Sequence, residues 1–327
     1  MIPNRNGGHT IGKCLTAALA SRYEPFEVVV VDDFSTDDSV AVIEQTLRAQ
    51  PRGRLIRLPQ HAGAAGARNA GAANSAGEIL FFIDADCLLE PDSLAAAQRA
   101  VAEQGPDTVV GGTYTIRPYD RSFFSRFQSA FIHYSETKKL TNPDYIASHA
   151  LVIAAATFRG SGGFPEQFMP IIEDVEYTHR LRRNGHRLVM HQGILVQHIF
   201  NFSFRTWFRN AFRKSRHWTR YSLYNHDVFA DSGTASLELK VDVVVFFVVL
   251  LLLLAALVLW QPAWLLPVPF LLAGNALVSR GLLRTFRRAG GLGFFAAAVV
   301  YYSLVYPLPV AVGAAVGLIE YPRKGVR

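Results

Sequence analysis

Cysteine is scarce in this sequence, which has only Cys14 and Cys87 among its 327 residues. Two cysteines provide neither a disulfide framework nor a metal-binding pattern, and they are compatible with a reducing, cytosolic environment. The sequence also shows no nucleic-acid-binding motif, so we expect no nucleic acid partner. No signal peptide is visible, because the first residues, MIPNRNGGHT, are polar.

Charge is absent from two long stretches near the C-terminus. Residues 243–279 and 290–319 contain no Asp, Glu, Lys or Arg, although the whole chain is 18% charged. A bilayer-spanning helix needs about 20 apolar residues, and both stretches are long enough. Residues 1–200 have an ordinary charge density. We therefore expect a globular domain over residues 1–200, an interfacial helix and linker over 201–240, and a transmembrane anchor over 241–327.

The anchor is expected to contain two spanning helices, at about 243–260 and 263–279. Pro262 and the tryptophans beside it suit a tight turn at the far interface of the membrane. The arginine-rich segment 280–288 is expected to be a loop that returns to the side of the globular domain. The last stretch, 292–319, has two prolines in its middle, so it either spans once with a kink or re-enters as two half-helices.

A basic, aromatic helix is expected at residues 204–221, FRTWFRNAFRKSRHWTRY. Its arginines recur at steps of four, four, three and four residues, and so share one helix face: Arg205, Arg209, Arg213, Arg216 and Arg220. Such a helix suits the membrane interface, with its rings at the lipid boundary and its arginines among the headgroups. The alternatives are a helix packed on the globular domain with a solvated basic face, and arginines that bind a lipid-linked phosphate.

Apolar strands alternate with helices in the first 120 residues, as in FEVVVV at 26–31 and ILFFI at 79–83. This pattern predicts an α/β domain whose central sheet is mostly parallel and covered on both faces. A domain of this kind is expected to open with a full strand. Residues 1–3, MIP, look like the tail of such a strand, so either the recorded start is late or the sheet begins unusually short.

Acidic residues occur in three places along this domain: Asp32-Asp33, Asp84-x-Asp86 and Glu173-Asp174. The first two follow apolar strands, and ligands of open α/β sheets bind at the carboxyl ends of strands. An Asp-x-Asp pair can hold a divalent cation that carries a diphosphate. Each pair taken alone is explained equally well as a turn former or helix cap.

The order and spacing of several motifs carry more information than any one of them. The chain shows IPNRN (2–6), VVVVDDFSTDDS (28–39), GAAGARNAG (63–71), FFIDADC (81–87), GGF (162–164), and ED followed by RL and G (173–185). Over roughly residues 1–200 it resembles the family 2 glycosyltransferases. The resemblance implies a GT-A fold with a mostly parallel sheet, in a membrane-anchored member of bacterial type.

The resemblance also implies the roles of individual residues. A UDP-, GDP- or dTDP-sugar donor would contact Pro3, Asn6, Asp32, Asp33, Arg68 and Asp84. Mg²⁺ or Mn²⁺ would bind Asp86 and Asp84, with His198 as a further contact. Asp174 would be the general base, with Glu173 as the alternative. The acceptor or lipid contacts would be Glu173, Arg209, Arg213, Arg216 and Trp218.

With these residues in these roles, we expect an inverting, metal-dependent sugar transfer to a lipid or lipid-linked glycan hydroxyl in cell-envelope glycan synthesis. The catalytic domain would face the cytoplasm, on a multi-pass protein of the cell (inner) membrane. His149 stands where a small polar residue is common in the family, which leaves the acceptor open. KSRHW at 214–218 lacks the Gln-x-x-Arg-Trp of processive synthases. The alternatives are a polyprenyl-phosphate sugar transferase, a nucleotidyltransferase on a similar scaffold, and a non-catalytic membrane protein.

Overall fold

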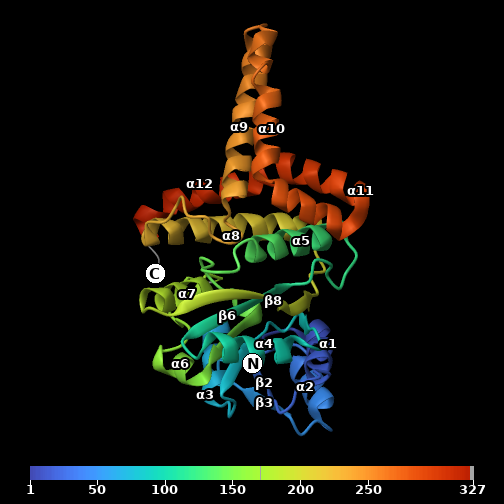
Figure 1. The fold of residues 1–327 in the computed structure, drawn as a ribbon, viewed down its shortest axis with the longest axis vertical. Helices are drawn as coiled ribbons and strands as arrows, with labels where there is room; N and C mark the ends of the chain where they lie inside the picture. Colours follow the sequence, from blue (N-terminus) through green and yellow to red (C-terminus); the bar gives the residue numbers. More distant parts are fainter. Residues whose placement is uncertain (170, 325–327) are drawn as a thin grey trace. The chain divides into compact units, whose positions relative to one another are not determined.

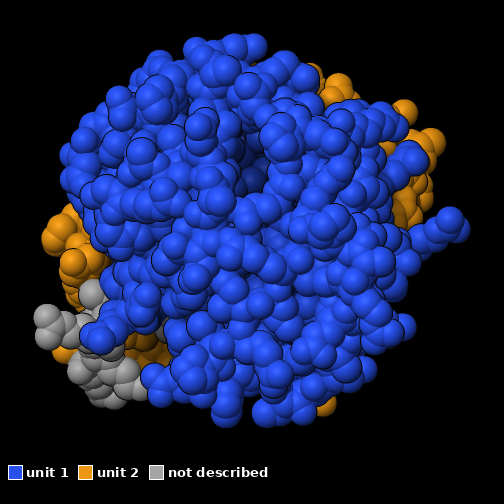
Figure 2. All heavy atoms as spheres, turned by 90° about the horizontal axis from the view of Figure 1, so that it is seen from below, with its two compact units in different colours: residues 1–121, 139–201 blue, residues 122–138, 202–327 orange. Residues whose placement is uncertain are grey.

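The computed structural model describes residues 1–169 and 171–324, which form two compact units (Figures 1 and 2). Unit 1 contains Met1–Arg121 and Lys139–Asn201, and unit 2 contains Ser122–Lys138 and Phe202–Arg327. Unit 1 is an α/β domain, and unit 2 is helical. Residues 122–138 therefore group with the C-terminal helices, although they lie in the middle of the predicted globular domain.

The first sheet of unit 1 is parallel and has the order β1-β2-β3. Its strands are β1 (Ile2–Asn4), β2 (Val28–Asp32) and β3 (Gly53–Arg57). All five residues of β2 are buried, as expected of an apolar strand with both faces covered. Helices α1 (Gly8–Leu19), α2 (Ser39–Leu47) and α3 (Gly63–Ala73) alternate with these strands.

The second sheet has the order β4-β7-β6-β8-β5. Its strands are β4 (Ile79–Phe82), β5 (Cys87–Leu89), β6 (Thr108–Tyr114), β7 (Leu151–Ala154) and β8 (Arg187–His198). Only β6 and β8 pair in parallel, and the other three pairings of this sheet are antiparallel. The expectation of a mostly parallel sheet is wrong for this half, because a buried apolar strand looks the same in sequence whichever way it runs.

Aromatic packing fixes the helix α7 (Glu173–Arg183) near the end of β4. The ring of Phe82 lies 5.2 Å from that of Phe164, and Phe164 lies 4.7 Å from Tyr177 on α7. All three side chains are buried. Helices α4 (Ser93–Gln104) and α6 (Ala155–Gly160) complete the unit, with a single 3-10 turn at Ser148–Ala150.

Unit 2 contains α5 (Phe123–Thr137), α8 (Phe204–Asn225), α9 (Leu237–Val258), α10 (Val268–Val278), α11 (Arg280–Leu304) and α12 (Pro307–Lys324). In Figure 1, α9 and α10 form a hairpin that projects away from the other helices of this unit. Two helical segments, Leu237–Val258 and Arg280–Pro322, are long and apolar enough to cross a membrane, and Pro262–Val278 is a shorter apolar segment. These findings are weak support for a membrane anchor.

Two details of the predicted anchor differ in the structure. Residues 280–288 are helical, not a loop, because Leu and Arg are good helix formers. The helix α11 bends at Gly291, whose φ of 74° is left-handed. The stretch 292–319 is divided between α11 and α12 just before Pro307. Whether it spans once with a kink or re-enters as two half-helices stays a prediction.

The core of unit 2 is aromatic, and α5 contributes to it although the sequence analysis did not foresee this helix. Phe127 of α5 lies 5.0 Å from Phe286 and 4.9 Å from Tyr301, measured between ring centres. Trp207 of α8 lies 4.6 Å from Tyr301 and is 1% exposed. Trp207 is therefore a core residue of this unit and is not among the exposed rings of α8.

The arginine face of α8 is divided. Arg205, Arg209 and Arg213 are exposed, as expected of an interfacial helix. Arg216 instead makes two hydrogen bonds of 2.7 Å to the carboxylate of Glu320 on α12, and Arg220 is buried. The C-terminal half of this face is therefore covered by other parts of the unit, which a regular arginine spacing cannot reveal.

Candidate active site

The turn after β4 carries Asp84 and Asp86, directly before β5. The amide N–H of Cys87 donates to the carbonyl of Asp84 at 3.0 Å and closes this turn. The apolar run from Ile79 to Ile83 is thus a strand that ends in two carboxylates. Both aspartates are partly exposed, so their oxygens can be reached by a ligand.

Arg68 joins two of the acidic pairs. It lies on α3, is 5% exposed, and donates to Asp84 at 2.7 Å and to Glu173 at 2.9 Å. Its guanidinium also lies 5.5 Å from the ring centre of Phe164. Arg68 and Glu173 are 105 residues apart in the chain. One buried cation therefore brings the Asp-x-Asp turn and the start of α7 together.

The two aspartates of the turn are electrostatically different. Desolvation by burial disfavours the charged form of Asp84, but Arg68, with His149 and His198 nearby, lowers its pKa below the ordinary value. Burial raises the pKa of Asp86, and the negative charge of Asp84 adds to this effect against the opposing influence of His198. The ionised form of Asp84 is thus already stabilised by Arg68, whereas the ionised form of Asp86 would be stabilised by a further positive charge.

A candidate cation site lies at Asp86. A carboxylate oxygen of Asp86, the sulfur of Cys87 and a ring nitrogen of His198 lie within 4.8 Å of one another, because Cys87 of β5 is paired with His198 of β8. Burial raises the pKa of the Cys87 thiol well above its ordinary value, so this sulfur stays protonated and is a poor ligand. The carboxylate oxygen suits Mn²⁺ or Mg²⁺ with further oxygen ligands from a diphosphate, whereas an imidazole nitrogen is a better ligand for a transition metal such as Mn²⁺ than for Mg²⁺. Asp84 is not part of this group.

Glu173 and Asp174 form the first turn of α7, where the helix dipole favours negative charge. Asp174 accepts hydrogen bonds from the amide N–H of Ser148 at 2.9 Å and from its hydroxyl at 3.3 Å. Burial and the neighbouring Asp174 raise the pKa of Glu173, in spite of Arg68. Glu176 lies near Arg180 and Arg183 instead, at 4.0 and 3.7 Å. Of the three carboxylates, Asp174 is the one without an arginine partner of its own among the described ion pairs.

Asp32 and Asp33 are both buried at the end of β2, and each organises a loop. Asp32 accepts from the side chain of Asn4 at 3.0 Å and from the amide of Ser35 at 3.0 Å. Asp33 accepts from the amides of Ala62 and Gly63, at 2.6 and 3.0 Å, and so fixes the start of α3. Their contact with a nucleotide stays a prediction.

Asn6 ties the loop after β1 to the loop after β2. The amide of Asn6 donates to the hydroxyl of Ser35 at 2.9 Å, and the amide of Thr36 donates to the Asn6 side chain at 2.8 Å. Pro3, in β1, is half-buried. The roles of Pro3 and Asn6 in donor binding stay predictions.

His149 and Tyr114 are site residues that sequence reasoning did not select. The imidazole of His149 stacks on the Tyr114 ring at 4.1 Å, and Tyr114 lies 5.0 Å from His198. Both are buried, and the charge of His149 acts on Asp84. The only sequence signal was that His149 departs from the family pattern.

The predicted acceptor or lipid contacts belong to two units: Glu173 to unit 1, and Arg209, Arg213, Arg216 and Trp218 to unit 2. Glu173 belongs to the Arg68 cluster of unit 1, and Arg216 is engaged with Glu320 in unit 2. Arg209 and Arg213 are exposed, and Trp218 is half-buried beside Tyr221. Whether any of them meets an acceptor stays a prediction.

The fold and site together define an α/β domain with acidic residues gathered at the ends of its strands. Residues 1–159 match the model of the family described as "Glycosyl transferase family 2", and this part of the chain is a domain of that family. The predicted α/β fold class is confirmed, apart from the antiparallel pairings of the second sheet.

Curated relatives are similar over part of their length. Glycosyltransferase GlyG of Streptococcus pneumoniae is 27% identical over 124 residues, which are 38% of this chain and 41% of GlyG. Glycosyltransferase AglE of Haloferax volcanii is 26% identical over 200 residues, 61% of this chain and 65% of AglE. Succinoglycan biosynthesis protein ExoO of Rhizobium meliloti is 31% identical over 153 residues, 45% of this chain and 40% of ExoO. The chain thus matches less than two thirds of each of these proteins.

Solved structures share the fold at low identity. Mannosyltransferase PcManGT from Pyrobaculum calidifontis, solved with GDP-Man and Mn²⁺, has a TM-score of 0.59 at 17% identity, covering 98% of this chain and 86% of that one. S. aureus TarS 1-349, solved with UDP-GlcNAc, has a TM-score of 0.54 at 17% identity, covering 98% of this chain and 90% of that one. At this identity the likeness shows the GT-A fold alone.

Proposed function

We propose that this protein is a membrane-anchored glycosyltransferase that moves a sugar from a nucleoside-diphosphate donor to a hydroxyl acceptor with inversion. The acceptor is a lipid or lipid-linked glycan, and the donor is a UDP-, GDP- or dTDP-sugar. The observation that carries the proposal is the bridge made by Arg68, which brings the Asp84 turn and the Asp174 helix end into one site. Two similar folds are solved with GDP-Man and with UDP-GlcNAc, which supports a sugar-nucleotide donor.

The cation side of the site is Asp86 with His198. A divalent cation held there supplies positive charge to the leaving diphosphate. Asp84 stays ionised beside Arg68 and is left to contact the donor from the other side of the turn. Five other residues are assigned to donor binding. Pro3 lies in β1, Arg68 bonds Asp84 and Glu173, and Asn6, Asp32 and Asp33 shape the neighbouring loops through the hydrogen bonds described above.

Asp174 is proposed as the general base. A direct displacement needs a carboxylate on the acceptor side, apart from those that hold the donor, and such proton transfer contributes about 10²–10⁴-fold. The hydrogen bonds from Ser148 fix one oxygen of Asp174, so the carboxylate is held in one orientation. If the acceptor were a phosphate, it would need no base, and Asp174 would matter little.

The anchor is proposed to cross the cell membrane through α9 and α10, with the catalytic domain on the cytoplasmic side. Large apolar side chains of α9 point outwards, for example Leu257, which is 67% exposed. Exposed leucines at this density suit lipid and not water. The exposed arginines of α8 suit the anionic headgroups of the cytoplasmic leaflet.

The test uses the full chain in membranes, with donors labelled in the sugar or in the nucleotide. Asp174→Asn is expected to keep donor binding and to lower the rate of sugar transfer by at least about a hundredfold. Glu176→Gln is the matched control, because Glu176 lies on the same helix turn but pairs with Arg180 and Arg183. Asp86→Asn or EDTA should abolish transfer, with Mn²⁺ restoring it only in the wild type.

Each alternative has its own outcome in this experiment. Transfer that survives Asp174→Asn indicates a phosphate acceptor. Label that moves with the nucleotide indicates a nucleotidyltransferase. Activity that persists in EDTA contradicts the cation assignment, and no transfer from any sugar nucleotide contradicts the proposal as a whole.

A further inference from the structure

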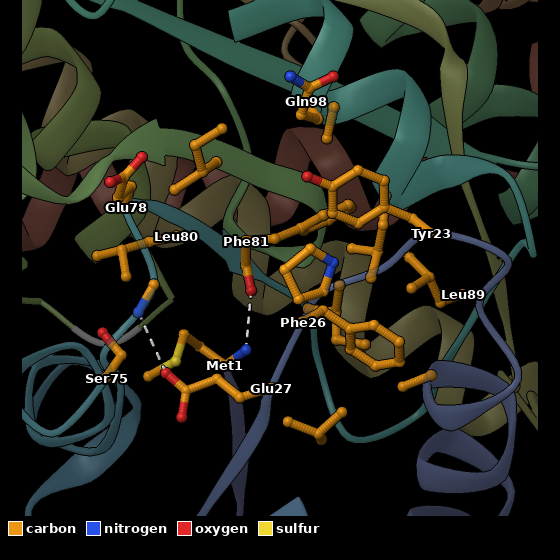
Figure 3. A pocket seen from close by; sticks show the side chains of 18 of the residues that line it. Met1, Tyr23, Phe26, Glu27, Ser75, Glu78, Leu80, Phe81, Leu89 and Gln98 are labelled. Atoms are coloured by element: carbon orange, nitrogen blue, oxygen red, sulfur yellow. Dashed lines mark hydrogen bonds between the residues drawn. The ribbon is translucent and has the colours of Figure 1, made fainter. Parts of the chain in front are cut away.

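Two features of the structure lie apart from the candidate active site. Unit 1 has a cavity of about 540 Å³ whose lining is mostly apolar, and none of the active-site carboxylates lines it (Figure 3). Nothing among the described residues shows what occupies this cavity. Unit 2 contains a group of buried oxygen atoms that lack hydrogen-bond partners, and the chemistry of these atoms indicates which kind of ligand they would take.

Asp242 is the charged member of this group. It lies on α9, is 1% exposed, and accepts a hydrogen bond of 2.6 Å at Oδ1 from the side-chain amide of Asn275 on α10. Its other oxygen, Oδ2, has no hydrogen-bond partner, although Ser303 of α11 lies near the carboxylate. Among the described residues no Lys or Arg pairs with Asp242, whereas Glu238, one turn earlier on α9, has Lys138 at 2.7 Å.

Three further oxygens beside Asp242 are also buried and unpartnered. They are the Asn275 amide oxygen on α10, the Ser279 hydroxyl between α10 and α11, and the Tyr302 hydroxyl on α11, in residues that are 6%, 2% and 1% exposed. Asn275 bonds Asp242 directly, and Tyr302 lies close to Ser279 and near enough to Asp242 to feel its charge. The four oxygens thus gather at the end of the hairpin where α9 begins and α10 ends (Figure 1).

Four buried oxygens without partners require an occupant, because buried polar atoms of native proteins are nearly always paired. A buried carboxylate is stable in its ionised form only when it is paired or coordinates a metal ion. Carboxylate and amide carbonyl oxygens are ligands of hard cations, and hydroxyl oxygens can take the place of water among them. One carboxylate balances a single positive charge, whereas a divalent ion would leave an excess charge buried.

We propose that one alkali metal cation, Na⁺ or K⁺, binds to the four side chains that carry these oxygens: Asp242, Asn275, Ser279 and Tyr302. Oδ2 of Asp242 neutralises the ion, and the amide oxygen and the two hydroxyls complete the protein ligands. The bond from the Asn275 amide to Oδ1 fixes the orientation of the carboxylate. The ion joins α9 and α10 to α11 and so stabilises this end of the hairpin. An Asp within a membrane-spanning segment often marks an ion site, which agrees with the position of Asp242.

The experiment measures thermal unfolding of the full chain in detergent, with EDTA present so that divalent cations do not contribute. All four tryptophans belong to unit 2, so their fluorescence reports the unfolding of that unit. In about 0.15 M NaCl or KCl, the wild type should unfold at a Tm at least about 4 °C higher than in choline chloride, because a ligand that binds only the folded state stabilises it. Asp242→Asn should remove this difference, and it should also remove the broadening of the sodium NMR line that the wild type causes.

Glu238→Gln is the matched control, because Glu238 is a buried carboxylate of the same helix that has Lys138 as its partner. This control should lower Tm in every salt and leave the difference between the salts unchanged. Tyr302→Phe keeps the ring and removes one ligand oxygen, so it should raise the cation concentration for half-maximal stabilisation at least about threefold. This variant decides the question if Asp242→Asn does not fold.

Equal Tm of the wild type in choline, sodium and potassium salts would overturn the proposal, and would indicate that a proton neutralises Asp242 instead. So would a cation effect that survives Asp242→Asn, or an unchanged half-maximal concentration in Tyr302→Phe. None of these measurements depends on the proposed sugar transfer or on the divalent cation at Asp86.

Discussion

Replacement of Arg68 by methionine is the sharpest test of how the active site is held together. Arg68→Met keeps a long, flexible side chain that can still pack on Phe164, but it removes the cation between Asp84 and Glu173. The carboxylates of Asp84 and Glu173 then lose the guanidinium that bonds both of them. The substitution should destabilise unit 1 and also raise the pKa of Asp84, which Arg68 now lowers.

The magnitude follows from the burial of the three groups. Breaking a buried ion pair by removing one partner costs about 3–5 kcal/mol, because the remaining charge is left unpaired. The side chain of Asp84 is 34% exposed and that of Glu173 is 14% exposed, so water relieves part of this cost. We therefore expect a loss of about 3 kcal/mol, which lowers Tm by about 6–12 °C for a domain of this size.

The assay is thermal unfolding of the full chain, with Arg22→Met as the control. Arg22 pairs with Asp92, but their side chains are 70% and 67% exposed, and exposed pairs contribute little. The double variant Arg68→Met/Glu173→Gln should regain part of the lost stability, because it removes one of the two stranded charges. An Arg68→Met protein that unfolds within about 2 °C of the wild type would refute the reasoning, and so would a double variant that regains nothing.

Three further predictions concern other parts of the chain. Asp33→Asn keeps the shape but weakens the bonds to the amides of Ala62 and Gly63, and should cost about 1–3 kcal/mol in unfolding experiments. Arg216→Met should destabilise unit 2, and Glu320→Gln should partly reverse the loss; no recovery in the double variant contradicts the pairing. Burial and the neighbouring arginines lower the pKa of His217 below 6.5. Stability from this group is therefore fully present above pH 6.5 and is lost as the pH falls further. His217→Gln should make Tm depend less on pH below pH 6.5.

The parts of the fold that local sequence determines could be predicted. The apolar runs at β2 and β4 read as buried strands, and the acidic turns that follow them read as ligand positions. The direction of β7 could not be read, because a short strand buried on both faces has the same pattern in either orientation. The helix α5 was missed because its apolar residues serve the core of unit 2, which lies far along the chain.

The sequence supplied candidate site residues, but it could not supply the contacts between them. The bond between Arg68 and Glu173 spans 105 positions and depends on how α7 packs on β4 through Phe164 and Tyr177. Likewise, only the pairing of β5 with β8 brings His198 beside Asp86. His149 belongs to the site because it stacks on Tyr114, and no local sequence pattern predicts such a stack.

The charge balance of the site leads to a last prediction, about the order of binding. The carboxylates of Asp84, Glu173 and Asp174 act on the guanidinium of Arg68, and Asp86 lies two residues from Asp84. Burial, and after it the neighbouring carboxylates, raises the pKa values of Asp86 and Glu173. A nucleoside diphosphate adds more negative charge. We therefore expect the donor to bind well only after a divalent cation has offset the carboxylates at Asp86. In calorimetric titrations, UDP or GDP should bind at least about tenfold more weakly without Mn²⁺. Asp86→Asn removes a negative charge, so it should strengthen nucleotide binding without Mn²⁺ and weaken the gain in affinity that Mn²⁺ gives. Equal affinity with and without Mn²⁺ in the wild type would show that Arg68 alone neutralises the site.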